Sequence, residues 1–422
     1  MVDELLAIVA GLTLVLALLG NRLDRLDVTV PMASILAGII VFGIHEVTAL
    51  DASSVHAMAE MALVIILFHD ASTVRLGQLR RDKGVPIRLL VVGFPLALLS
   101  TFVTGLALLP ALGAAGALLL AAAVTPTDAG LGAPTILNPR VPVRVRRALN
   151  VESGLNDGLA TLLVLFALAL LAEQEGVRLP IVLQVGLVSV FLAVALAVVV
   201  GLGSAWFVLR SLDRGWTSSR DRSIAVLVTP LLLLGLAGVI GANVFIAAFV
   251  GGMTFGAAPG RPAADESTVS LLETAADLLG VLIWFLAGGL VLLALDHGFS
   301  WQWPVLAVLA LTVLRLVPVS ISLLGSGLRT PSVLFISWFG PRGLATIVFA
   351  LLAVEELGAD HGVIPDVTGV VAFVVTISVF AHGISARPCS RRYGEWADRE
   401  RPPTEHAVAA EPLPARGRTR SP

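Results

Sequence analysis

The sequence predicts an all-α polytopic membrane protein. Of its 422 residues, 57% are hydrophobic and 14% are charged, whereas soluble domains contain about 25% charged residues. The mean hydropathy is +0.92, and apolar stretches of the roughly 20 residues that a membrane helix needs recur along the whole chain. Loops rich in Arg and Lys alternate with loops that have almost none. These observations exclude a soluble globular domain.

Apolar stretches between charged or Gly/Pro-rich breaks predict thirteen transmembrane helices. The first begins in an acidic segment without a cleavage-site pattern, so we expect it to be retained as a helix. The single cysteine, Cys389, excludes an internal disulfide. The thirteen predicted spans are residues 4–20, 30–44, 57–74, 85–109, 113–138, 147–172, 181–209, 222–240, 242–258, 270–294, 303–324, 331–354 and 364–386.

Basic residues predict which side of the membrane each loop faces. Clusters of Arg and Lys follow the first, third, fifth and seventh spans, and only Arg178 lies in a loop on the opposite side. Cytoplasmic loops carry an excess of Arg and Lys. We therefore expect a multi-pass protein of the cell inner (plasma) membrane, surrounded by lipid, with its N-terminus outside and its C-terminus in the cytoplasm.

The predicted spans form two matching sets of six. Spans one to six and spans eight to thirteen begin at positions offset by ~215 residues, and the seventh span reverses the orientation of the second set. Inverted repeats of this kind are typical of secondary transporters. The sequence therefore predicts a transmembrane domain over residues 1–388, with repeats at about 4–172 and 222–386 and a linking helix at about 181–209.

The last part of the chain differs in composition from the spans. Residues 389–422 are rich in Pro and Arg and show no apolar periodicity. This composition is typical of disordered segments. We expect a disordered cytoplasmic tail.

A few charged residues lie deep within the predicted spans. A charge near the centre of the bilayer costs at least ~2.5–3.5 kcal/mol on insertion scales, so such residues are functional or paired. The two arginines among them can neutralise two acids, and the remaining acids then need a cation or protons. The residues are Asp70, Asp128, Glu152, Asp157, Arg315 and Arg342.

The sixth span carries four polar residues in the segment "ESGLND". Residues four apart share one face of a helix. Ser153 and Asp157 therefore form one polar face, which we interpret as facing a substrate. Glu152 and Asn156 form the neighbouring face, which we interpret as facing a structural partner.

Two corresponding spans are predicted to be broken. The fifth contains "TPTDAGLGAP", in which Pro126 precedes Asp128, and the twelfth contains "FGPRG", in which Pro341 precedes Arg342. Proline removes a backbone donor and interrupts a helix. Free carbonyls and a carboxylate suit a hard cation, and paired broken helices indicate a transport site.

Together, "TPTDA", "ESGLND" and "GPRG" on these spans resemble the NhaP-type sodium/proton antiporters of the cation/proton antiporter superfamily. The resemblance covers about residues 1–388 and implies a homodimer. It implies that Asp157 binds the ion and the proton in turn. Ser153, Asp128 and the main-chain oxygen of Thr127 would complete a sodium shell, with Asp70 in the place of an acidic ligand on the third span.

The same resemblance implies a structural role for the other polar residues of the core. Glu152 would pair with Arg342 and also with Arg315, and Asn156 would be structural. Because Asn156 beside Asp157 cannot ionise, the resemblance favours electroneutral, one-for-one exchange of sodium or lithium for protons. A second proton on Asp70 or Asp128 remains an alternative to one-for-one exchange.

Other functions remain as alternatives. A potassium/proton antiporter of the same fold would use the same kind of oxygen site. A cation channel would need a continuous pore, and an intramembrane hydrolase would need a base, for which only His69 is placed in the core. We expect a transporter and not an enzyme, with no cofactor and no nucleic-acid partner.

Overall fold

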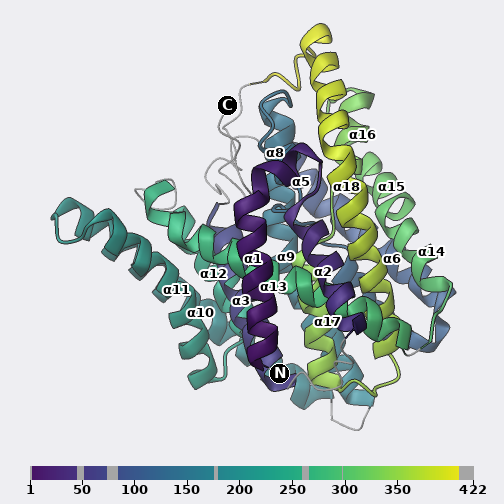
Figure 1. Ribbon diagram of the computed structural model, residues 1–422, viewed down its shortest axis with the longest axis horizontal. Helices are drawn as coiled ribbons and strands as arrows, with labels where there is room; N and C mark the ends of the chain where they lie inside the picture. The colour runs from purple at the N-terminus through teal and green to yellow at the C-terminus, as the bar shows by residue number, and fades with distance from the viewer. Residues whose placement is uncertain are drawn as a thin grey trace.

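The computed structural model describes residues 2–44, 52–73, 84–174, 179–258, 266–296 and 298–407, and within these ranges it contains helices and no strands. Most of the helices run side by side, with α10 and α11 at one side (Figure 1). The first repeat expected from the sequence contains α1 (Val2–Arg25), α2 (Val30–Ile44), α3 (Ala52–Thr73), α5 (Val85–Arg88), the π-helical turn η1 (Leu89–Gly93), α6 (Phe94–Leu108), the 3₁₀ turn η2 (Pro110–Leu112), α7 (Gly113–Val124), α8 (Ala133–Ile136) and α9 (Val143–Gln174).

The linking helix and the second expected repeat follow. They contain α10 (Leu179–Asp213), α11 (Ser219–Ile240), α12 (Val244–Ala257), α13 (Glu266–Asp296), α14 (Gln302–Leu311), α15 (Val313–Ser322), α16 (Thr330–Trp338), α17 (Leu344–Leu357) and α18 (Ile364–Glu400).

Seven stretches of helix among the described residues are long and apolar enough to cross a membrane. Four shorter apolar helices lie beside them, at residues 6–20, 30–44, 110–124 and 244–257. The fifth and twelfth predicted spans are absent from the long set because each is divided into short pieces. The seven are residues 85–108, 143–172, 186–213, 219–240, 268–296, 302–322 and 364–400.

Both expected breaks are present. α7 ends at Val124, and only one helical turn, α8, follows the irregular residues 125–132. In the twelfth predicted span, α16 ends at Trp338 and α17 begins at Leu344. A proline lies in each gap, where its missing N–H and its ring oppose a continuous helix.

A further interruption was not expected from the sequence. The eleventh predicted span divides into α14 and α15 at Thr312, whose φ of −114° and ψ of −97° are not helical. No proline lies at Thr312, so the sequence carries no signal for this break. Arg315 follows it in the first turn of α15.

Two pairs of helices pack closely because glycines face the neighbouring backbone. A Cβ on Gly38 of α2 would lie 2.1 Å from the carbonyl oxygen of Phe285 on α13. A Cβ on Gly252 of α12 would lie 2.3 Å from the carbonyl oxygen of Phe68 on α3. Any larger residue at these positions would push the helices apart.

The predicted disordered tail is wrong for residues 389–407. α18 continues to Glu400, and residues 401–407 turn back against the bundle. Tyr393 stacks on Phe335 and on Trp396, with ring centroids 4.2 and 5.5 Å apart. These buried aromatic contacts outweigh the Pro- and Arg-rich composition from which disorder was predicted. The rest of the predicted tail, residues 408–422, lies outside the described residues.

Candidate ion-binding site

The helix α9 places four polar side chains inside the bundle. Glu152, Ser153, Asn156 and Asp157 are each at most 8% exposed. Ser153 and Asp157 are neighbours along one face of α9, and Glu152 and Asn156 are neighbours along the next. The two polar faces expected from the sequence therefore both point into the interior.

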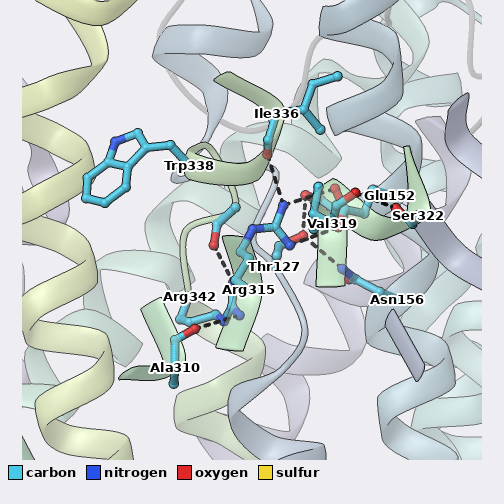
Figure 2. Close-up of polar contacts among 12 residues, drawn as sticks. Thr127, Glu152, Asn156, Ala310, Arg315, Val319, Ser322, Ile336, Trp338 and Arg342 are labelled. Carbon is cyan, nitrogen blue, oxygen red and sulfur yellow. Dashed lines mark hydrogen bonds and ion pairs between the residues drawn. The ribbon is translucent and has the colours of Figure 1, made fainter. Parts of the chain in front are cut away.

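Thr127, in the break after α7, joins residues from both of these faces. Its Oγ1 lies 2.8 Å from Ser153 Oγ and accepts a hydrogen bond of 2.8 Å from Asn156 Nδ2. Figure 2 shows the Thr127 and Asn156 side chains pointing toward one another. Asn156 thus belongs to the same polar cluster as Ser153, a contact that the helix pattern alone did not reveal.

The amide oxygen of Asn156 is a second feature of this cluster. Asn156 is 1% exposed, and its Oδ1 has no hydrogen-bond partner among the residues that the structure describes. A buried acceptor is normally satisfied by a protein group, an ordered water or an ion. This amide oxygen is therefore an acceptor that the protein groups of the cluster leave to a water or an ion.

Asp128 connects the two breaks. Its Oδ1 accepts from the N–H of Leu131 at 2.7 Å, and its Oδ2 accepts from the N–H of Leu344 at 2.8 Å. Its own N–H donates to the carbonyl of Pro341 at 2.8 Å. Both carboxylate oxygens are thus hydrogen-bonded to the main chain, and direct contact of Asp128 with a cation stays a prediction.

Arg342 makes the reverse connection. Its guanidinium is buried at 2% exposure, and its Nε donates to the carbonyl of Val124 at 2.6 Å. The other nitrogens donate to the carbonyl oxygens of Gly340 and Ala310, and the second of these contacts, at 3.4 Å, is drawn in Figure 2. Arg342 therefore closes the C-terminal end of α7.

The charged residue of each break lies at a helix end that borders the other break. Asp128 lies at the N-terminus of α17, where unpaired N–H groups carry a partial positive charge. Arg342 lies at the C-terminus of α7, where unpaired carbonyls carry a partial negative charge. One acid in the first break and one base in the second are therefore complementary.

Glu152 pairs with Arg315. Arg315 Nη1 and Nη2 donate to the two carboxylate oxygens at 2.9 and 3.1 Å, and Nη2 also lies 3.4 Å from the carbonyl of Ile336 (Figure 2). The expected pairing of Glu152 with Arg342 is therefore corrected. Arg342 uses its donors on main-chain carbonyls, and the arginine of α15 takes the carboxylate.

The two glycines of "GPRG" make room for these charged groups. A Cβ on Gly340 would lie 2.0 Å from the guanidinium carbon of Arg315. A Cβ on Gly343 would lie 2.1 Å from Asp128 Oδ2. Both distances are far below contact, so a side chain at either position would displace the charge beside it.

Asp70 lies on α3. It is buried, and its Oδ1 lies 3.0 Å from Nδ1 of the adjacent His69. α3 packs against both α9 and α17. Asp70 therefore lies on a helix that borders the site, and its contact with an ion stays a prediction.

A cavity of about 370 Å³ is lined in part by Asp128. It lies between α1, the start of α2, α13 and the two breaks, and Asp277, Thr13 and Thr274 also line it. Most of its remaining lining residues are apolar. The cavity therefore places a space lined in part by two acids, Asp128 and Asp277, beside the break in the fifth predicted span.

Sequence reasoning missed two buried polar residues at the second break. Ser378 and His382 of α18 are 0% and 2% exposed, and both contact the segment between α16 and α17. His69 was expected to be the only histidine of the core, which is wrong. Their spacing of four residues on one apolar helix is the signal that could have identified them.

This arrangement, in which buried charges connect two interrupted helices of a membrane-spanning bundle, is typical of ion-coupled secondary transporters. Comparison with known proteins identifies the class as NhaP-type cation/proton antiporters. A family model described as "Sodium/hydrogen exchanger, transmembrane" matches residues 11–392. The chain therefore belongs to the sodium/hydrogen exchanger family.

The named relatives of the chain are cation/proton antiporters, which agrees with this family membership. The chain is 26% identical over 413 residues to the K(+)/H(+) antiporter NhaP2 of Shewanella baltica (strain OS223), covering 92% of this chain and 67% of that protein. It is 26% identical over 315 residues to a Na(+)/H(+) antiporter of Schizosaccharomyces pombe, covering 66% and 65%. The chain thus spans about two thirds of the length of these relatives, and 58% of another NhaP2, from Shewanella sp. (strain ANA-3).

A solved structure has the same fold. The sodium proton antiporter MjNhaP1 from Methanocaldococcus jannaschii at pH 8 matches with a TM-score of 0.73, over 93% of this chain and 98% of that chain. The sequence identity is 20%, so this likeness concerns the fold alone. Together with the family match, it identifies a helical, multi-pass membrane protein.

Proposed function

We propose that the protein is a secondary antiporter that exchanges sodium or lithium ions for protons at Asp157. One observation carries this proposal. Asp157 is a membrane-embedded carboxylate, 8% exposed and one helical turn from Ser153, whose hydroxyl contacts Thr127 in a broken helix. Family membership and the names of the relatives agree with cation/proton exchange.

The proposed cation shell combines oxygens from α9 and from the first break. Asp157 and Ser153 come from α9, and Thr127 and Asp128 come from the break. The hydrogen bond between Thr127 and Ser153 supports this grouping. The two main-chain hydrogen bonds to the Asp128 carboxylate fix its orientation, and each of its oxygens keeps a further lone pair for the cation.

Exchange follows from competition for one charge. A sodium ion and a proton each neutralise Asp157, so binding one releases the other. The empty, ionised site carries an uncompensated charge, and moving that charge through a low-dielectric barrier costs several kcal/mol. The occupied site is nearly neutral and moves more easily.

We propose one-for-one, electroneutral exchange. The residue before Asp157 is Asn156, whose amide does not take up or release a proton at physiological pH. Its Nδ2 donates a hydrogen bond to Thr127. Glu152 is held in a two-bonded pair with Arg315. Asp157 is thus the acid of α9 that is left to alternate between proton and cation.

A potassium/proton antiporter is the second candidate. The NhaP2 relatives carry the name K(+)/H(+) antiporter, whereas the relative from Schizosaccharomyces pombe and MjNhaP1 carry names that specify sodium. Oxygen ligands suit either ion, and the chain's similarity to both groups is comparable. The transport assay below therefore includes both ions.

We also propose the thirteen crossings, the inverted repeat and the orientation that the sequence predicts. Two equivalences support the repeat. Gly38 and Gly252 each pack against the backbone of a neighbouring helix, and Asp128 and Arg342 each lie just after the proline of a break. The two residues of each pair are 214 positions apart. α1 begins at the lower end of the bundle in Figure 1 and α18 ends at the upper end, which supports opposite sides for the termini. The homodimer stays a prediction from the family resemblance.

The proposed function is tested in everted membrane vesicles with an imposed pH gradient. We expect sodium or lithium to collapse the gradient in the wild type, with a rate that does not respond to membrane potential. Asp157→Asn is expected to abolish the response. Asp296→Asn, at the exposed end of α13, is the matched control and should behave as the wild type.

The outcomes separate the candidates. A response to potassium alone would select the potassium/proton antiporter. Normal exchange by Asp157→Asn would overturn the site, and a rate that follows membrane potential would overturn one-for-one exchange.

A further inference from the structure

Ser378 and His382 lie one helical turn apart on α18, outside the proposed cation shell. Both side chains are buried, and both face the break between α16 and α17. A histidine and a serine at this depth in an apolar helix need hydrogen-bond partners. The partners that they have lie at the two ends of the break.

The contacts form a chain from one end of the break to the other. The N–H of Arg342 donates to Ser378 Oγ at 2.7 Å, and Ser378 Oγ lies 3.2 Å from His382 Nδ1. His382 Nε2 lies 3.0 Å from the carbonyl oxygen of Trp338. Trp338 is the last residue of α16, and Arg342 lies just before α17.

The donors and acceptors of this chain indicate one form of the imidazole. A neutral histidine has one N–H and one acceptor nitrogen. With the hydrogen on Nε2, His382 donates to Trp338 and accepts from the Ser378 hydroxyl, which itself accepts from Arg342. Every group between Trp338 and Arg342 in the chain then has a complementary partner, and the main-chain oxygen of Ser378, 2.9 Å from Nδ1, is left to the main-chain hydrogen bonding of α18.

The other forms leave a less favourable arrangement, because the Ser378 main-chain oxygen has a helical partner whereas the Trp338 carbonyl depends on Nε2. His382 Nδ1 is also 2.9 Å from the main-chain oxygen of Ser378, so a hydrogen on Nδ1 would serve that oxygen but would leave Nε2 facing the Trp338 carbonyl without a donor. A doubly protonated ring would serve both oxygens, but it would add a buried positive charge near Arg342 and Arg315, whose charges act on this ring.

We propose that His382, with its hydrogen on Nε2, is a positioning residue that works through Ser378. Together they fix the residues between Trp338 and Arg342 to one turn of α18. This segment holds Asp128, since the carbonyl of Pro341 accepts from the Asp128 N–H and Leu344 donates to its carboxylate. The effect on transport rests on the proposed function, whereas the form of the imidazole does not.

Transport kinetics in proteoliposomes provide the first test. Ser378→Ala is expected to raise the half-saturating cation concentration about two- to tenfold, the factor that corresponds to one hydrogen bond, with the maximal rate within about twofold. Ser378→Thr keeps the hydroxyl and should restore wild-type affinity. Ser378→Ala combined with His382→Gln should be no worse than the more severe single variant, because both break one chain.

The matched control is Thr368→Val. Thr368 is buried on the same helix, but its hydroxyl bonds to the carbonyls of Ile364 and Pro365 within α18. Its loss should leave the cation affinity unchanged. Equal affinities for the Ser378→Ala and Thr368→Val proteins, or additive effects in the double variant, would overturn the positioning role.

Nitrogen-15 NMR of histidine-labelled full-length protein provides a test that needs no transport. The His382 signals are assigned by their absence from His382→Gln. We expect a protonated Nε2 and an unprotonated Nδ1, and a change at Nδ1 in Ser378→Ala. A protonated Nδ1 would overturn the inference, whereas a wild type that exchanges none of sodium, lithium and potassium would overturn the proposed function instead.

Discussion

Gly343 has no side chain, and for this reason the carboxylate of Asp128 can reach the first turn of α17. The distance from a Cβ at this position to Asp128 Oδ2 would be 2.1 Å. The need for glycine here therefore follows from the space that a side chain would occupy.

Gly343→Ala is expected to displace the Asp128 carboxylate and to lower transport activity more than stability. The displaced carboxylate loses its hydrogen bond to Leu344, and a charge at a helix N-terminus contributes about 0.3–2 kcal/mol. The rate of gradient collapse and the melting temperature in detergent are the measurements. Gly362→Ala, which meets no atom within 4 Å, is the control, and equal behaviour of the two variants would contradict the prediction.

The pair of Glu152 and Arg315 leads to a stability prediction. Glu152→Gln leaves a buried guanidinium without its counter-charge, which is expected to cost about 3–5 kcal/mol. Arg315→Met combined with Glu152→Met removes both charges and should be more stable than either single variant. Thermal unfolding of the purified proteins measures both, and a Glu152→Gln protein with the wild-type melting temperature would contradict a structural role for the pair.

For individual residues, the sequence indicated which charged side chains are buried in the core but not which of them form pairs. The cost of burial identified Glu152, Asp128, Arg315 and Arg342 from residue type and position alone. The partner of Glu152 depended on the break at Thr312, which nothing in the sequence signals. The pairing could therefore not be predicted from the order of residues along the chain.

Among the elements, the segment after α18 contributes an unexpected support for α16. Glu405 is 1% exposed, and its Oε1 accepts from the Arg329 N–H at 2.8 Å and from Ser332 Oγ at 2.7 Å. These groups lie in the first turn of α16, where a carboxylate is favourable. Arg144 of α9 also donates to the carbonyl of Thr404 at 2.8 Å.

Glu405→Gln is expected to lower the melting temperature, by the equivalent of about 1–3 kcal/mol. The amide keeps the shape of the side chain but loses the charge, and hydrogen bonds to a charged group contribute more than neutral ones. Glu395→Gln on the exposed side of α18 is the control. A Glu405→Gln protein as stable as the control would show that the contact contributes little to stability.

This segment shows the limit of composition as a signal. The sequence "RPCSRRYGEWADRERPP" has few apolar residues, and most of its charged side chains are solvated. The two aromatic residues, Tyr393 and Trp396, and one acid supply the contacts that hold it. Averages over the segment conceal these three residues, of which Tyr393 and Trp396 lie on the continuing helix and Glu405 lies after its end.

Across the whole molecule, the two close-packed helix pairs provide a test of the repeat. Gly38→Ala and Gly252→Ala are each expected to destabilise the protein by about 1–3 kcal/mol, because each added methyl group would collide with a carbonyl of the partner helix. Gly238→Ala of α11, which meets no atom within 4 Å, serves as the control. Thermal unfolding compares the three, and a large effect at only one of the two positions would argue against equivalent packing.

The architecture was predictable to the extent that it depends on hydropathy and proline. The apolar stretches located most helices, and the prolines at positions 126 and 341 located both breaks. The lengths of the pieces, such as the single turn of α8 and the extension of α18, depend on contacts between distant segments. Those contacts were not encoded in any local pattern.

The contacts that Asp128 and Arg342 make across the two breaks have a consequence for how the protein can move. Moving the first break without the second would separate Asp128 from the start of α17 and Arg342 from the end of α7. We therefore expect any displacement that opens the proposed site to move Asp128 and Arg342 together.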